Sequence, residues 1–145
     1  MHVLQILRQK GREVVSLSAD ASLSEATLLL SHKRIGAVVI KDEQGKLAGI
    51  LSERDVVRAL STESVRALAR PCSAYMTRAV ATCREGDTVE ELMEMMTQGR
   101  FRHVPVLDEQ HRLCGLVSIG DVVKMQIEEI TREASNLRQY IAAAG

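Results

Sequence analysis

The sequence predicts an α+β protein: two pseudo-twofold-related β-α-β-β-α repeats packed sheet to sheet, with a long C-terminal helix. The main observation is a duplication, because a shift of 66 positions, the separation of Asp55 and Asp121, aligns 14–58 with 80–124 without a gap. Composition agrees, since 46% of the 145 residues are hydrophobic and only 2% are aromatic, enough for an aliphatic core. Identical at this offset are Val14, Glu25, Val38, Asp42, Glu43, Gln44, Leu47, Gly49, Ser52, Asp55, Val56 and Val57 of the first copy.

Each copy shows the same order of local patterns. Short strands are predicted at 14–17 and 80–83, each followed by a helix whose start carries a capping-box pattern, Ser22 with Glu25 and Asp87 with Glu90. Apolar runs at 35–40 and 101–107, polar turns at 41–46 and 108–112, and strands at 47–51 and 113–117 predict one hairpin per copy. A second helix then begins after Ser52 or its counterpart at 118.

The predicted organisation has four parts. Residues 1–62 form repeat 1 with an N-terminal helix, 63–75 a connector helix interrupted by Pro71, 76–125 repeat 2, and 126–145 a C-terminal helical extension. The connector aligns with the N-terminal segment at the same offset, so the helix before each repeat is duplicated as well.

The last helix carries an apolar seam at alternating steps of four and three residues. This spacing indicates either an amphipathic helix lying on its own domain or a contact with a second copy of the chain, which favours a homodimer. The seam consists of Val123, Ile127, Ile130, Ala134, Leu137 and Ile141.

Bulk properties exclude several classes of function. Nineteen acidic and nineteen basic residues cancel, and the chain has no Trp, so general nucleic-acid binding is disfavoured. No long apolar run indicates a membrane segment, and the start shows no signal sequence, so we expect a cytoplasmic protein. Three well-separated cysteines and four scattered histidines predict neither disulfides nor a metal site.

The pattern Gly-x-x-Ser-x-x-Asp occurs twice, each time where a predicted strand meets a helix. Its serine and aspartate are Ser52 and Asp55 in the first copy and Ser118 and Asp121 in the second. Serine with an acid three residues later caps a helix, which explains both residues without a ligand. Alternatively, a carboxylate beside a helix N-terminus accepts hydrogen bonds from the vicinal hydroxyls of a ribose. The sequence leaves both interpretations open.

A second cluster lies in 100–106. Strand alternation would place Arg100 and Arg102 on one side, where they make a plausible phosphate clamp, and His103 on the other unless the strand begins irregularly. The simpler interpretation is a solvated strand end, with Pro105 marking an edge or a bulge.

Together, the duplication, the two Gly-x-x-Ser-x-x-Asp segments and the Arg-His-Val-Pro-Val run resemble a pair of cystathionine-β-synthase (CBS) domains, a Bateman module, and are similar to the small stand-alone bacterial CBS-pair proteins. The resemblance implies adenosine nucleotides bound in two clefts between the repeats. One cleft would combine Ser16, Ala37 and Val38 with Ser118, Ile119, Asp121, Arg102 and His103; the other would combine Thr82, Val104 and Pro105 with Ser52, Arg54 and Asp55, while Arg100 serves either.

The clefts are predicted to differ because repeat 1 has Gly36 near the position of Arg102. We expect this glycine to leave room for a dinucleotide such as NAD(H) beside AMP, ADP or ATP. The function that follows is an adenine-nucleotide sensor without catalytic residues or metal, whose ligand alters contact with a second copy or an unknown protein target. The alternatives are a nucleotide-using enzyme of unknown reaction and, with less support, an RNA-binding module.

Overall fold

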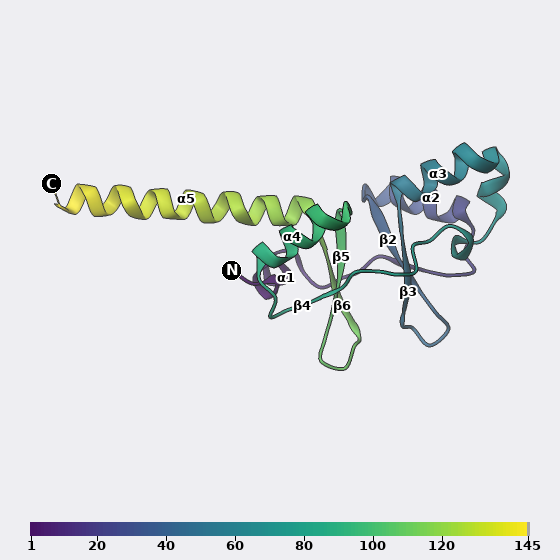
Figure 1. Cartoon of the computed structure of the whole chain (residues 1–145), viewed down its shortest axis with the longest axis horizontal. Coiled ribbons are helices and arrows are strands. Elements are labelled where there is room, and N and C mark those ends of the chain that lie inside the picture. The colour runs from purple at the N-terminus through teal and green to yellow at the C-terminus, as the bar shows by residue number, and fades with distance from the viewer. Residues whose placement is uncertain (145) are drawn as a thin grey trace.

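The computed structural model describes residues 1–144, which form two three-stranded sheets, helices covering each sheet, and a long C-terminal helix (Figure 1). The α+β prediction is confirmed. In chain order the elements are α1 (Val3–Lys10), β1 (Ser16–Ser18), α2 (Leu23–Lys33), β2 (Ala37–Lys41), β3 (Leu47–Ser52), α3 (Glu53–Glu63), the 3-10 helices η1 (Ser64–Ala69) and η2 (Cys72–Ala74), β4 (Cys83–Arg84), α4 (Val89–Gly99), β5 (His103–Leu107), β6 (Leu113–Ser118) and α5 (Ile119–Ala144).

The two sheets have the same topology and register. Their orders are β1-β2-β3 and β4-β5-β6, with the first pair of strands parallel and the second antiparallel. Ala37 pairs with Ser52 in the first sheet, and His103 pairs with Ser118 at the equivalent place in the second. The duplication seen in the sequence is therefore a duplication of structure.

Pro105 shortens the pairing between β4 and β5 at its N-terminal end. In repeat 1 the Val39 N–H donates to the Val15 carbonyl at 3.2 Å, whereas Pro105, at the equivalent position, has no N–H to donate to Ala81. The ladder between β4 and β5 therefore begins only at Cys83. Pro105 lies in the central strand β5, but it pairs only with Leu116 of β6, so the strand has an unpaired side at this residue, and a register shift follows between Val106 and Leu107.

The cap of α4 also differs from the prediction by one residue. Thr88, not Asp87, is the N-cap, and it forms a capping box with Glu91 rather than Glu90. The Asp87 carboxylate instead accepts the Arg84 N–H at 2.8 Å, which holds it in the turn before the helix. Both residues suit a cap, so the sequence alone did not separate them.

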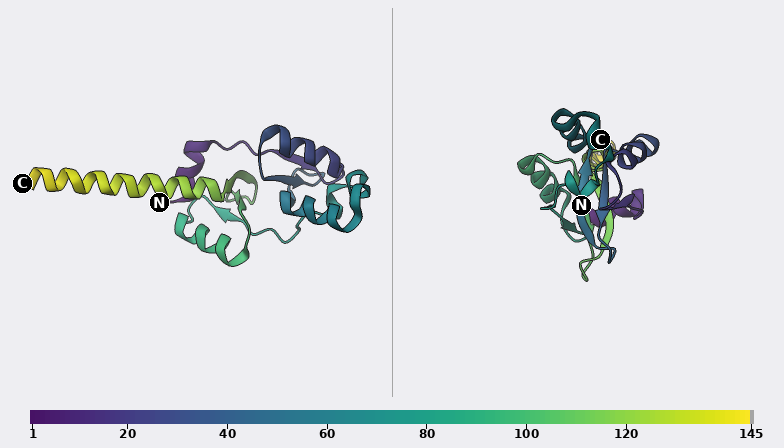
Figure 2. Two further views of the ribbon diagram at one scale, coloured as in Figure 1. Left: turned by 90° about the horizontal axis from the view of Figure 1, so that it is seen from above. Right: turned by 90° about the vertical axis from the view of Figure 1, so that its right-hand side faces the viewer.

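Each half has its own hydrophobic core, and the helices that precede the repeats are exchanged between them. The first core includes Ala67 and Cys72 from the connector, which packs on repeat 1. The second core includes Val3, Ile6 and Leu7 of α1, which are 0%, 2% and 1% exposed. Figure 2 shows the two chain segments that cross between the halves as a result.

This exchange bears on the predicted organisation. The boundaries at 62, 75 and 125 remain predictions, but α1 was grouped with repeat 1 and packs instead on repeat 2. Backbone hydrogen bonds fix it there, from the Val3 N–H to the Asp87 carbonyl and from the Val89 N–H to the Met1 carbonyl, both at 2.9 Å. The 66-residue offset shows which helices are equivalent, but it does not show which core each one joins.

The last helix leaves the body of the protein. Figure 1 shows its outer part extending away from the rest of the protein. Val122 and Met125 near its start are buried against the second core, but every residue from 130 to 144 is exposed. The apolar seam faces solvent, with Ile127, Ile130 and Leu137 about 60% exposed. The interpretation of α5 as a helix lying on its own domain is therefore wrong. No helix among residues 1–144 is both long and apolar enough to span a membrane.

Candidate functional site

A cleft of about 730 Å³ lies between the two halves. It is bounded by the end of β3 and the start of α3 from repeat 1, the crossing segment 77–81, and the junctions before β5 and after β6 from repeat 2. The lining residues are Gly36, Ile50, Ser52, Glu53, Arg54, Asp55, Val57, Arg58, Thr77, Ala79, Val80, Ala81, Gly99, Arg100, Phe101, Arg102, His103, Ser118, Ile119 and Gly120. We call it the Asp55 cleft.

Asp55 is a cap and a cleft residue at once. Its Oδ2 accepts hydrogen bonds from the Ser52 N–H at 2.9 Å and the Ser52 hydroxyl at 3.1 Å, which completes the capping box of α3. Asp55 is only 7% exposed, and no hydrogen bond among residues 1–144 reaches its Oδ1. The two interpretations of the motif are thus compatible, because one oxygen serves the helix and the other remains free for a hydroxyl.

The cleft is cationic. Four arginines line it, Arg54, Arg58, Arg100 and Arg102, against the carboxylates of Glu53 and Asp55. Guanidinium groups bind phosphate oxygens through paired N–H donors, so this surplus suits an anionic ligand.

The arginines come from both halves. Arg54 of repeat 1 donates from Nη1 to the Arg100 carbonyl of repeat 2 at 3.4 Å, a contact that crosses the cleft mouth. Arg100 ends α4 in the left-handed conformation, with φ of 56°, and β5 begins only at His103. Strand alternation therefore does not apply to 100–102, and Arg100, Arg102 and His103 all line the cleft instead of pointing in opposite directions.

The equivalent carboxylate of repeat 2 has a different environment. Asp121 Oδ2 accepts from the Ser118 N–H at 2.8 Å and the Ser118 hydroxyl at 3.0 Å, like its counterpart, but also from Lys10 Nζ at 2.7 Å. The same ammonium donates to the Leu116 carbonyl at 2.7 Å. Burial acts to raise the pKa of Asp121, but the hydrogen bond from Lys10 and the Ser118 N–H outweigh it, so the pKa lies below its usual value.

Lys10 replaces a backbone contact that only repeat 1 makes. There the Ile50 carbonyl accepts the Thr77 N–H at 2.9 Å, and the Thr77 carbonyl accepts the Ile50 N–H at 3.0 Å. The residue equivalent to Lys10 is Met76, which packs on Gly49 and leaves Asp55 without an ammonium. The exchange of a lysine for a methionine thus leaves Asp121 in an ion pair through Oδ2 and Asp55 without one, while the Oδ1 of each carboxylate accepts no hydrogen bond among residues 1–144.

His103 fills the space beside Gly36. A Cβ placed on Gly36 would lie 3.1 Å from His103 Cε1 and 3.3 Å from Nε2. The room that we expected Gly36 to leave for a dinucleotide is therefore taken by an imidazole. Burial lowers the pKa of His103, as do the nearby charges of Lys10 and Arg102, while Asp121 and Glu53 act to raise it.

The predicted site residues divide into two groups. Gly36, Ser52, Arg54, Asp55, Arg100, Arg102, His103, Ser118 and Ile119 line the Asp55 cleft. Ser16, Ala37, Val38, Thr82, Val104, Pro105 and Asp121 are not among its lining residues. Ala37, Val38 and Val104 are almost fully buried in the sheets, so their side chains are core. Their roles in binding remain predictions.

Sequence reasoning missed part of the cleft wall. Thr77, Ala79, Val80 and Ala81 line it because the segment between the halves runs along its side, and Phe101 adds an aromatic face. A signal was present for Ala81 alone, because Pro105 has no N–H for the Ala81 carbonyl and the β4 ladder begins only at Cys83.

The cysteines lie away from this chemistry. Burial raises the pKa of the Cys83 thiol to about 12, and burial also raises the pKa of Cys72 and Cys114. All three thiols are therefore protonated at neutral pH and weak nucleophiles. Among residues 1–144, no group of three or more His, Cys, Asp or Glu side chains is arranged to hold a metal ion.

The comparison with protein families decides what this arrangement is. The CBS domain pattern matches residues 5–62 and again 72–128, one match for each repeat. The chain belongs to the CBS domain family. It carries the domain as a tandem pair, as the resemblance in its sequence implied.

Solved structures of CBS proteins have the same fold. A CBS-domain containing protein from Agrobacterium tumefaciens is 46% identical, with a TM-score of 0.83 over 86% of this chain and 92% of that one. The CBS domain pair of protein MJ0100, in complex with 5′-methylthioadenosine and S-adenosyl-L-methionine, is 27% identical, with a TM-score of 0.79 over 89% and 98%. A CBS domain protein from Pyrobaculum aerophilum complexed with AMP is 27% identical, with a TM-score of 0.75 over 83% and 89%.

Proposed function

We propose that this CBS pair is a sensor of adenine nucleotides and that the Asp55 cleft is its binding site. Ligand binding between the halves changes their relative packing and thereby the association of the protein with a second copy or with another protein. The observation that carries the proposal is the free oxygen of a nearly buried carboxylate in a cleft lined by four arginines. The AMP complex of the Pyrobaculum protein and the adenosine-based ligands of MJ0100 support it.

Each part of the cleft suits one part of such a ligand. The Asp55 carboxylate and the Ser52 hydroxyl suit the ribose, the arginines suit the phosphates, and the apolar faces of Val80, Ala81 and Phe101 suit the adenine. The Ala81 carbonyl, which Pro105 leaves without its ladder partner, is an acceptor for the adenine amino group.

A mononucleotide fits the proposal better than NAD(H). The expectation of a dinucleotide depends on free space beside Gly36, and the His103 ring occupies that space. We therefore propose AMP, ADP or ATP as the ligand, in the cytoplasm, with NAD(H) as a comparison.

Calorimetric titration of AMP, ATP, S-adenosyl-L-methionine and NADH tests the proposal. Asp55→Asn removes the charge but keeps a carbonyl oxygen for the Ser52 N–H, so we expect the fold to persist and nucleotide affinity to fall by about 1.5–3 kcal/mol, or roughly 10–100-fold. Asp121→Asn is the matched control, and we expect near wild-type affinity because Asp121 does not line the Asp55 cleft and its charge is paired with Lys10. Wild-type protein that binds none of these ligands would contradict the sensor.

The alternatives make different predictions. An enzyme converts the nucleotide during long incubation, whereas a sensor releases it unchanged, which mass spectrometry distinguishes. An RNA-binding module prefers single-stranded RNA over free mononucleotide, with a steep dependence on salt. The raised thiol pKa values give the enzyme no activated cysteine among residues 1–144.

A further inference from the structure

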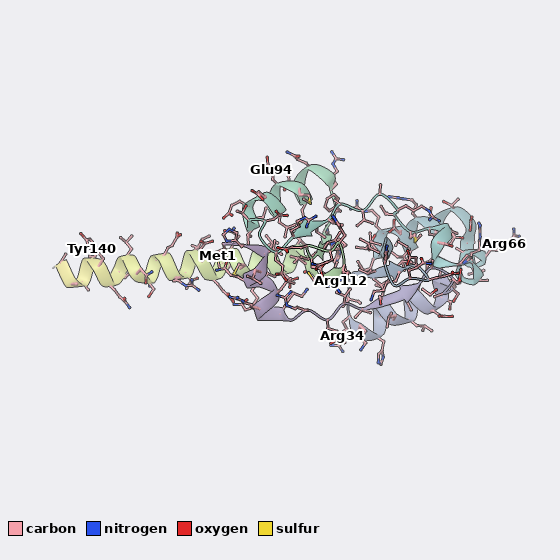
Figure 3. The ribbon with its side chains drawn as sticks, turned by 90° about the horizontal axis from the view of Figure 1, so that it is seen from below. Met1, Arg34, Arg66, Glu94, Arg112 and Tyr140 are labelled. Carbon is pink, nitrogen blue, oxygen red and sulfur yellow. The ribbon has the colours of Figure 1, made fainter. Side chains whose placement is uncertain are left out.

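The outer part of α5 is a helix without packing partners in the monomer. Figure 3 shows Tyr140 far along this helix, well beyond Met1 and the rest of the body. Residues 130–144 are all exposed, and an isolated helix of about this length is only marginally stable in water. Packing of an apolar face is what normally stabilises such a helix, so the seam calls for a partner.

The seam has the geometry of a two-stranded coiled coil. Val123, Ile130 and Leu137 occupy one set of heptad positions, d, and Ile127, Ala134 and Ile141 occupy the other, a. The part nearest the body is accessible as well, because Val122 and Met125 face the second core while Val123 is 48% exposed and Ile127 is 59% exposed. The body therefore does not cover the seam.

We propose that the partner is a second copy of this chain, joined through α5 as a parallel, in-register coiled coil. This extends the self-association proposed above by naming its surface and orientation, and it does not depend on nucleotide binding.

The charges beside the seam decide the orientation. In a parallel pair, each position g lies near position e of the following heptad in the partner, which brings Glu133 of one copy to Arg138 of the other on both sides of the seam. A fully overlapped antiparallel pair matches e with e and g with g instead. That arrangement places Lys124 against Arg138 and Glu133 against Glu133, so like charges meet at every one of these positions.

The first test measures the dimer dissociation constant of ligand-free protein by sedimentation equilibrium. In a parallel dimer, Arg138→Glu replaces the guanidinium of each copy by a carboxylate that lies beside Glu133 of the other copy. We therefore expect the dimer dissociation constant to rise roughly tenfold. The double variant Glu133→Arg with Arg138→Glu restores opposite charges, and we expect it to regain most of the affinity. Arg132→Glu, the same change on the outer face of the helix, is the control that leaves the dimer unchanged.

Other outcomes overturn the proposal. In an antiparallel dimer, the carboxylate introduced by Arg138→Glu would lie beside Lys124 of the other copy and strengthen association. A wild-type protein that stays monomeric at all concentrations would exclude the coiled coil.

Cross-linking gives a second readout of the orientation. In the parallel dimer, Ile141→Cys should form a disulfide-linked dimer under mild oxidation. Cross-linking only between Val123→Cys and Ile141→Cys in a mixture would show the opposite orientation.

These tests fail separately from those of the sensor. Loss of the dimer with nucleotide affinity intact contradicts only the coiled coil, whereas a stable dimer that binds no nucleotide contradicts only the Asp55 cleft.

Discussion

At the scale of single residues, Lys10 makes the two halves chemically unequal. Its ammonium donates to Asp121 Oδ2 and to the Leu116 carbonyl, while Met76 at the equivalent place has no donor for Asp55. A ribose that docks at Asp121 therefore meets a carboxylate whose charge is already paired with an ammonium, and one that docks at Asp55 meets a carboxylate without an ion pair.

The first prediction at this scale is that Lys10→Met creates a second binding site. The substitution copies the residue of repeat 1, removes the ammonium that is paired with Asp121 Oδ2, and costs about 1 kcal/mol of stability by removing the donor to Leu116. We expect calorimetry to show two nucleotides per chain instead of one. Lys46→Met, on the exposed turn between β2 and β3, should leave the stoichiometry at one. An unchanged stoichiometry in Lys10→Met would contradict the idea that Lys10 blocks a site.

The second prediction concerns His103 and pH. Its pKa in the folded protein lies below the ordinary value of 6.5, because it is buried and faces Lys10 and Arg102. As pH falls below about 6.5, the unfolded chain gains a proton that the folded protein resists, so the stability contributed by neutral His103 is lost. Urea unfolding at pH 7.5 and 5.5 should show a smaller loss in His103→Gln than in the wild type. Equal losses would mean that the other three histidines, all exposed, or the carboxylates account for the effect.

The sequence identified residues with suitable binding groups more reliably than it identified which of them contact one another in the fold. Ser52 and Asp55 were found from spacing alone, because a serine and an acid three residues later must approach each other at a helix start. Lys10 was missed because it reaches Asp121 across 111 positions of chain, and no local pattern reports such a contact. Val104 and Pro105 belong to the matching motif and lie buried in β5, so their side chains pack in the sheet and their roles in binding remain predictions.

At the scale of elements, the junction between β3 and the crossing segment fixes one wall of the cleft. A Cβ on Gly49 would lie 2.8 Å from the Met76 Sδ and 2.8 Å from the Thr77 carbonyl oxygen. The thioether can move, but the carbonyl is held by its hydrogen bond to the Ile50 N–H. A glycine is required here so that the two backbones can approach.

We therefore predict that Gly49→Ala both destabilises the protein and weakens ligand binding. Overpacking at this place should cost about 2 kcal/mol of unfolding free energy, and the displaced segment 77–81 should reduce nucleotide affinity. Gly86→Ala is the control, because a Cβ there meets nothing within 4 Å and its backbone is not left-handed. Chemical denaturation and calorimetry measure the two effects. Loss of stability with full affinity would show that this segment does not shape the site.

Most elements were predictable because their signals are local. The hairpins and the second helices follow from apolar runs, polar turns and serine caps, and the structure confirms them within one to three residues. The cap of α4 was wrong, and the sequence did not place Pro105 in a central strand, because each depends on the neighbouring strand. A cap is chosen by how the preceding turn folds, and a proline is tolerated in β5 because β4 stops short of it.

At the scale of the whole molecule, the exchange of α1 sets which parts unfold together. Leu7 is 1% exposed and packs on Gly115, where a Cβ would come within 2.6 Å of its Cδ2. The helix at the start of the chain is therefore a structural part of the second half.

We predict that Leu7→Ala lowers stability by about 3 kcal/mol and does so in repeat 2. Hydrogen exchange should show lost protection in β5, β6 and α4, while β2 and β3 keep theirs. Leu30→Ala, in the core of repeat 1, is the matched variant and should produce the opposite distribution. Equal loss of protection in both halves after Leu7→Ala would mean that the two cores unfold as one unit.

The swapped helix also matters while the chain is being made. Synthesis runs from the N-terminus, so α1 leaves the ribosome before the second half and has no surface to pack on until about residue 125 has followed it, whereas the first sheet and its connector can assemble as soon as they emerge. While repeats 1 and 2 are being translated, the apolar face of α1 therefore has no core to join. Separating the two repeats at the gene level would therefore produce a second half whose core lacks α1, and a first half that carries α1 without the surface on which it packs.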